Sequence, residues 1–161
     1  MQVKTREAAA EETTKFYIYG VSGRCALVTR GQVYNLLKDH QNSTRAVLDT
    51  AANGICCAYN YLPFGDFMGA VFEEAGNGRV TDYLYTGQEL DGEIGLYNYK
   101  ARYYDSNLGR FYSTDPAGQF SSPYVYAGNN PVNLIDPSGE FAWIPFLIAI
   151  GIGAAIGGVL G

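Results

Sequence analysis

The chain has a single histidine, His40, and its three cysteines show none of the spacings by which Cys and His bind a metal. Phosphate-binding glycine loops are lacking as well. We therefore expect no metal and no cofactor. Cys25, Cys56 and Cys57 are expected to be buried thiols, although a bridge from Cys25 to either of the others remains open. No Ser, Cys or acid is arranged around His40 as a triad, which favours a solvated loop histidine.

Clusters of basic residues are also missing. The 11 Lys and Arg residues are scattered singly among 16 acidic ones, whereas phosphate recognition relies on clustered Lys and Arg. This excludes nucleic acid as an expected partner. Residues 1–15 are charged and lack the apolar stretch of a cleavable signal peptide. We expect them to form a polar lead-in to the folded region.

Apolar stripes with helical period are scarce, and residues 70–75 could make one or two helical turns at most. Short aromatic and β-branched runs instead alternate with turns rich in Gly, Pro and Asn. Strands are predicted at residues 16–19, 33–38, 44–49, 56–61, 80–86, 96–104 and 110–113. The polar residues 39–43 predict a hairpin loop, and Asn53-Gly54 predicts a tight turn. The pattern is typical of an all-β fold, an antiparallel meander.

Tyr-x-Tyr pairs recur through this series, and they account for much of the 14 tyrosines in the chain. The pairs are Tyr17/Tyr19, Tyr59/Tyr61, Tyr83/Tyr85, Tyr97/Tyr99 and Tyr124/Tyr126. Residues two apart in a strand share one face, so each pair is expected to place its rings side by side. The rings could form a stacking platform for sugars or bases. We favour core and cross-strand packing, which needs no ligand.

Specific motifs follow one another in the second half of the chain. They are YNYKARYYDSNLGRF at 97–111, STDPAG at 113–118, YVYAGNNP at 124–131 and DPSG at 136–139. These motifs closely resemble the Rhs-repeat-associated core, and a weaker resemblance to YD repeats extends over 16–140. The resemblance implies a spiralling β-sheet that forms a hollow shell, as in Rhs toxins, toxin-complex C subunits and teneurins. This chain would form the closing part of such a shell, and its partners would be the rest of the shell or a C-terminal toxin cargo.

Asp115 and Asp136 each begin an Asp-Pro step that a glycine follows closely. Turn formation is the simpler explanation, because Asp caps a turn, Pro fixes φ and Gly permits the reversal. The alternative is an aspartate dyad that shares one proton, in which one carboxyl acts as acid while the other activates water. Spacing alone does not show that the two carboxylates meet.

The resemblance gives the dyad a role, because Rhs cores of the toxin type are similar to intramolecular aspartyl proteases. By motif, Arg102, Asp115 and Asp136 match the positions tied to that cleavage. Arg102 would steady a carboxylate through a charge-assisted hydrogen bond. The cut would fall between Glu140 and Phe141. The family has Leu where this chain has Glu140, and a carboxylate there disfavours a negatively charged dyad.

No charged residue follows Glu140, and the remaining residues 141–161 are apolar and glycine-rich. As a helix they would span about 31 Å, close to the ~30 Å hydrocarbon core of a bilayer. Gly153 and Gly157 have small-xxx-small spacing, and Trp143 could anchor at an interface. We expect a hydrophobic, helical and membrane-spanning segment, although Pro145 interrupts the first turn. The alternative is the stub of a cargo domain inside the shell.

The sequence therefore predicts three regions: the lead-in 1–15, a β-domain at 16–140 and the hydrophobic segment 141–161. Three functions follow. The favoured one is structural, the closing of a β-shell that holds, and could release, a C-terminal cargo. The second is an aspartyl self-protease, and the third a teneurin-like cell-surface adhesion module. Each of them implies a location at a membrane, at the cell surface or outside the cell.

Overall fold

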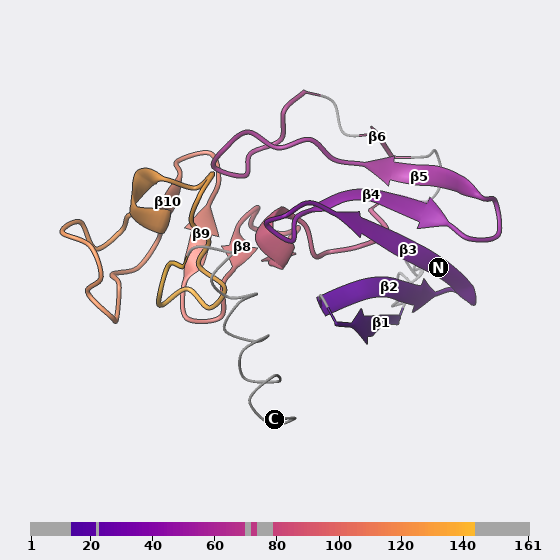
Figure 1. The fold of residues 1–161 in the computed structure, drawn as a ribbon, viewed down its shortest axis with the longest axis horizontal. Helices are drawn as coiled ribbons and strands as arrows, with labels where there is room; N and C mark the ends of the chain where they lie inside the picture. Colours follow the sequence, from indigo (N-terminus) through magenta and orange to yellow (C-terminus); the bar gives the residue numbers. More distant parts are fainter. Residues whose placement is uncertain (1–13, 22, 70–71, 74–78, 144–161) are drawn as a thin grey trace, which may run out of the picture.

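The computed structural model describes residues 14–21, 23–69, 72–73 and 79–143. These residues form two antiparallel sheets and two single turns of 3-10 helix. Figure 1 shows the long strands of one sheet on one side of the molecule and the short strands of the other sheet beside them. The prediction of an all-β antiparallel fold is confirmed.

The larger sheet has six strands that pair in the order of the sequence, which makes it a simple meander. Its strands are β1 (Lys15–Gly20), β2 (Gly23–Thr29), β3 (Gln32–Lys38), β4 (Thr44–Asp49), β5 (Gly54–Ala58) and β6 (Phe72–Glu73). Residues 39–43 connect β3 to β4, as predicted. The turn between β4 and β5 ends on Asn53, whose φ of 50° is the conformation that Asn tolerates better than most residues.

Three differences from the predicted strands occur in this sheet. The strand predicted at 56–61 is β5, which begins and ends earlier, at Gly54 and Ala58. Strand β2 was not expected, because Gly20 and Gly23 were taken together as the end of a strand, whereas they form the two sides of a tight hairpin. Phe72 and Glu73 pair with β5 as a short strand, so the helical turn considered at 70–75 is wrong for these two residues. The neighbouring residues 70–71 and 74–75 lie outside the described part of the chain.

A bulge in the pairing of β4 with β5 changes which side chains enter the core. Val47 pairs with Cys57 and Leu48 pairs with Ile55, so Cys56 is an extra residue. Cys56 and Cys57 are consequently both buried, while Cys25 is exposed. The expectation of buried thiols is confirmed for the adjacent pair and wrong for Cys25, because Cys25 faces the open side of β2. No disulfide joins these three cysteines, so the bridge from Cys25 to Cys56 or Cys57 that the sequence left open does not form.

The smaller sheet has strands of two or three residues, in the order β10-β9-β8-β7. They are β7 (Glu89–Leu90), β8 (Tyr97–Asn98), β9 (Tyr103–Asp105) and β10 (Arg110–Phe111). The single strand predicted at 96–104 is wrong, because a turn containing Lys100 at φ 70° divides it into β8 and β9. The strand predicted at 80–86 is also wrong. Thr86 has φ 46° and belongs to the 3-10 turn η1 (Tyr85–Gly87).

The buried tyrosines pack between motifs more than within them. Tyr85 contacts the rings of Tyr97 and Tyr126, with ring centroids 6.1 and 6.2 Å apart. The ring centroids of Tyr99 and Tyr126 are 5.6 Å apart. The Tyr99 hydroxyl is hydrogen-bonded to the hydroxyls of Thr86 and Tyr126. These tyrosines belong to one core with the inner face of the larger sheet. The core interpretation is confirmed, while the side-by-side pairing within each Tyr-x-Tyr is not what the ring contacts show.

The described fold runs past Glu140. Ala142 is buried, and the backbone of Trp143 pairs with that of Ile135 through two hydrogen bonds of 2.8 and 2.7 Å. Residues 141–143 are therefore extended, which corrects the start of the predicted helix. Residues 144–161 of that prediction lie outside the described part, as do residues 1–13 of the lead-in. Within the described part, no helix is both long and apolar enough to cross a membrane.

Candidate functional site

Arg102, Asp115 and Asp136 meet in the turn-rich half of the molecule. Arg102 Nη2 lies 3.2 Å from Oδ2 of Asp136 and 3.7 Å from Oδ1 of Asp115. All three side chains are buried, with exposures of 2 to 4%. The structure thus brings together the three residues that the sequence singled out, around one guanidinium.

The carboxylate of Asp136 builds its own Asp-Pro-Ser-Gly turn. Oδ1 accepts hydrogen bonds from the backbone N–H of Ser138 at 3.2 Å and of Gly139 at 2.7 Å. Oδ2 faces Arg102. Gly139 has φ 78°, and a Cβ atom there would lie 2.8 Å from the carbonyl oxygen of Tyr99. The turn consequently requires glycine at this position.

Asp115 holds its turn in a similar way. Oδ1 accepts from the N–H of Ala117 and Oδ2 from that of Gln119, both at 3.0 Å. Both aspartates therefore have the turn-forming role that their Asp-Pro-x-Gly context predicted. The charge count is a further property of the cluster. Two buried carboxyl groups face one buried guanidinium, the only cation that pairs with them among the described residues.

Arg102 also reaches the chain that follows the Asp136 turn. Its Nε donates to the carbonyl oxygen of Gly139, and its guanidinium stacks 3.7 Å from the centroid of the Phe111 ring. Nη1 lies 3.4 Å from the carbonyl oxygen of Pro123. Arg102 therefore ties both aspartates to the backbone just before the expected cleavage position.

Gln119 holds the chain on the other side of that position, and sequence reasoning missed it. Its side-chain amide donates to the carbonyl of Ala142 at 3.0 Å and accepts from the N–H of Ala142 at 2.8 Å. No motif marks this glutamine, because its partner is backbone that any residue could supply. Glu140 and Phe141, which flank the expected cut, are exposed between Gly139 and the buried Ala142.

The sequence of the chain is similar to those of several known proteins. No protein-family model matches the chain. Salivary gland surface protein 1 of Aedes aegypti is 42% identical over 149 residues, which cover 92% of this chain and 4% of that protein. The tRNA nuclease WapA of Bacillus subtilis strain 168 is 32% identical over 144 residues, 84% of this chain and 6% of its own length. Toxin proteins, including a Yersinia entomophaga subunit and Tse5 of Pseudomonas aeruginosa, match shorter stretches.

Among solved structures, the fold matches TcdB2-TccC3 without its hypervariable C-terminal region. The TM-score is 0.63 at 27% sequence identity, over 79% of this chain and 6% of that one. The chain belongs to the Rhs repeat-associated core family. The Rhs chain spans only a small fraction of the length of these relatives, 4 to 6% in the two curated proteins quoted above.

Proposed function

We propose that the chain forms the closing part of an Rhs β-shell and holds the segment that follows the Asp136 turn. The support is the way in which residues 139–143 are bound. Arg102 donates a hydrogen bond to the Gly139 carbonyl, and the Gln119 side chain is hydrogen-bonded to both the N–H and the carbonyl of Ala142. The backbone of Ile135 pairs with that of Trp143. Extended backbone bound at three successive places is fixed in register, which is what a shell needs in order to hold a cargo chain.

The partners proposed for this function are the remainder of an Rhs shell and a C-terminal toxin cargo. The toxin relatives and the fold shared with TcdB2-TccC3 support them. A membrane contact through 141–161, and a location at a membrane, at the cell surface or outside the cell, stay predictions, since residues 144–161 lie outside the described part.

Hydrogen exchange of the full chain tests the holding role. The amides of Ala142 and Trp143 should exchange slowly, because both are hydrogen-bonded. Gln119→Ala should speed exchange at Ala142 at least tenfold. The matched control is Asn107→Ala, at an exposed turn position, which should leave that rate unchanged. Exchange of both amides at the rate of an unstructured peptide would contradict the proposal.

A second candidate function is self-cleavage between Glu140 and Phe141. One observation favours it. The guanidinium that faces both aspartates also donates to the carbonyl of Gly139, one residue before that bond.

The chemistry requires one proton shared by Asp115 and Asp136. The ionised carboxyl takes a proton from a water molecule. The oxygen of that water molecule attacks the carbonyl carbon of Glu140. The protonated carboxyl hydrogen-bonds the carbonyl oxygen of Glu140. When the C–N bond breaks, the nitrogen of Phe141 takes a proton and leaves as an amine, and Glu140 keeps a new carboxylate. Arg102 fixes the position of the chain and balances the charge of the pair.

Intact mass of the purified full chain, followed over time, tests this second function. Cleavage should give fragments 1–140 and 141–161, and Asp115→Asn or Asp136→Asn should abolish it. Glu140→Leu should speed it, because a negative charge beside the pair is removed. A chain of constant mass, both as it stands and with Glu140→Leu, would exclude self-cleavage and leave the holding role intact.

The adhesion alternative gains no support from the tyrosine pairs. Tyr85, the second ring of the pair suggested for partner binding, is buried, and Tyr83 is covered by the Arg24 guanidinium at 3.4 Å from its ring centroid. Substituting these rings would perturb the core, so loss of partner binding on their removal would not separate adhesion from unfolding.

A further inference from the structure

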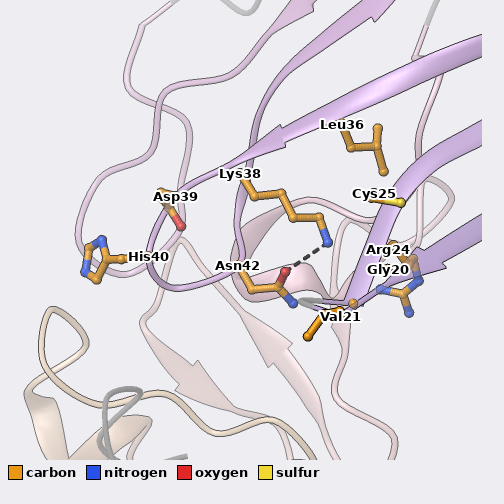
Figure 2. Close-up of a pocket in the computed structure, with 10 residues that line it drawn as sticks. Gly20, Val21, Arg24, Cys25, Leu36, Lys38, Asp39, His40 and Asn42 are labelled. Atoms are coloured by element: carbon orange, nitrogen blue, oxygen red, sulfur yellow. Dashed lines mark hydrogen bonds between the residues drawn. The ribbon is translucent and has the colours of Figure 1, made fainter. Parts of the chain in front are cut away.

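A hollow lies far along the chain from the aspartates, at one end of the larger sheet. It is an open groove of about 570 Å³ between the β1–β2 hairpin and the loop that follows β3. Figure 2 shows its side chains: Arg24 and Cys25 come from β2, Lys38 comes from the end of β3, and Asn42 comes from the loop. Nothing in the shell or cleavage functions uses this groove.

Two cations of the groove have no carboxylate partner among the described residues. The ion pairs within that part of the chain use Lys15, Arg79 and Arg102, and neither Arg24 nor Lys38 is among them. The one acidic side chain of the groove is Asp39. Its Oδ1 is occupied by the N–H groups of two residues of its own loop, at 3.0 and 2.9 Å.

Both cations are held in place by neutral groups. Arg24 donates Nη1 to the Gly87 carbonyl at 2.8 Å and Nε to the Tyr19 hydroxyl at 3.1 Å, and it stacks on Tyr83. Lys38 donates to Oδ1 of Asn42 at 2.9 Å, the contact dashed in Figure 2. In the described part of the chain, Arg24 Nη2 and two N–H groups of Lys38 are left without a protein acceptor.

The surroundings of Lys38 disfavour the charged form of its ammonium group. Burial of the ammonium, followed by the charge of Arg24, lowers its pKa from 10.5 to about 8. The Cys25 thiol acts weakly in the opposite direction. His40 is exposed and turned away from Lys38 in Figure 2. Two like charges fixed beside a half-buried hollow would be relieved by an anion between them.

We propose that the groove binds an oxyanion, a carboxylate or a phosphate-like group, between the Arg24 guanidinium and the Lys38 ammonium. The guanidinium offers the N–H groups of Nη2 to such oxygens, and the ammonium adds a point charge. The volume leaves room for more than the anion itself, so the ligand class is an acidic group carried on a larger molecule, resting against Leu36 and Cys25. This proposal is independent of the shell and cleavage functions.

Sulfate is the probe of choice for the test, because its charge is constant between pH 6 and pH 10. Side-chain NMR of the full chain would follow the Lys38 ammonium through a pH titration with and without sulfate, at equal ionic strength set with chloride. The midpoint should rise from about 8 toward the ordinary value of 10.5. A rise of one unit means that sulfate binds about tenfold more weakly above the titration than below it.

Variants separate a site from general screening. Lys38→Gln should weaken sulfate binding at least tenfold, while Lys100→Gln, which removes an exposed lysine elsewhere, should leave it unchanged. Arg24→Lys keeps the charge but loses the Nη2 donors, and it should weaken binding less than Lys38→Gln. Acetate in place of sulfate distinguishes a carboxylate site from a tetrahedral one, and saturable binding of either supports the proposal. It is overturned if chloride moves the Lys38 midpoint as much as both probes do, or if Lys38→Gln binds them equally well.

Discussion

The two sheets of this molecule are stabilised in different ways. Five of the six strands of the larger sheet are five to seven residues long, and its buried residues include Leu27 and Val47, which are fully buried. The smaller sheet has ladders of two or three residues, and it depends on packed tyrosines and on aspartates that close turns. Long ladders tolerate the loss of one contact. A turn-rich region depends on single polar groups.

High pH should give the largest difference. Burial raises the pKa of Tyr126 from 10.0 to about 12, and the pKa of its neighbour Tyr99 well above 10. The folded state then holds protons that the unfolded state releases near pH 10, so this stabilisation is complete below pH 10 and lost as the pH rises to 12. Amide exchange should show the region 97–126 opening at lower pH than strands β2 and β4, which contain no tyrosine. Simultaneous opening of both regions would break the comparison.

The next largest effect should follow the loss of the guanidinium between the two aspartates. Arg102→Met leaves two buried carboxylates without their cation, which should cost about 3–5 kcal/mol in urea unfolding. The control in the larger sheet is Lys15→Met. Lys15 pairs with Asp82 at 2.8 Å, but both side chains are partly exposed, so its loss should cost at most ~1 kcal/mol. Equal losses would show that burial of the cluster has no energetic consequence.

Glycine replacement sharpens the same contrast within the turns. Gly139→Ala combines positive φ with a Cβ atom 2.8 Å from the Tyr99 carbonyl, and it should cost about 3 kcal/mol. Gly118→Ala has φ 60° and no atom within 4 Å of the new Cβ, so backbone strain alone should cost about 1–2 kcal/mol. Thermal unfolding of the two variants checks the difference, which disappears if the Tyr99 backbone can move aside.

Removing one hydroxyl should give the smallest effect. Tyr99→Phe deletes a buried group that bonds Thr86 at 2.7 Å and Tyr126 at 3.2 Å, and it should cost about 1–2 kcal/mol. In the larger sheet, Tyr34 donates to Gln32, which is exposed. Tyr34→Phe should cost at most ~0.5 kcal/mol, since water can replace that partner. Urea unfolding measures both, and a larger loss for Tyr34→Phe would reverse the expected order.

The fold of the larger sheet was largely predictable, and that of the smaller region was not. The strand at 44–49 was predicted with the bounds that the structure has, because its apolar residues are bounded by clear turn residues. At 96–104 the same rules failed. Lys100 and Thr86 adopt positive φ without being glycine, and no residue pattern marks such positions. Long-range contacts, invisible to a local pattern, maintain them.

The candidate site was named through resemblance, and its geometry came from the fold. Arg102 and Asp136 are 34 positions apart, and short-range reasoning gives no distance between residues so far separated. Gln119 could not have been found, because it binds backbone. The groove at Arg24 and Lys38 was missed for a related reason. Its two cations are 14 positions apart and come together because β2 begins where its neighbour β3 ends, next to the loop that follows β3.

The bulge at Cys56 has a practical consequence for spectroscopy. Burial raises the pKa of the Cys56 thiol to about 12, and Cys57 is fully buried, so neither should react with maleimide in the folded state. Cys25 is exposed and lines the groove in Figure 2. Cys25 can therefore be labelled selectively without removing any native cysteine, and a ligand that rests against it should slow that labelling.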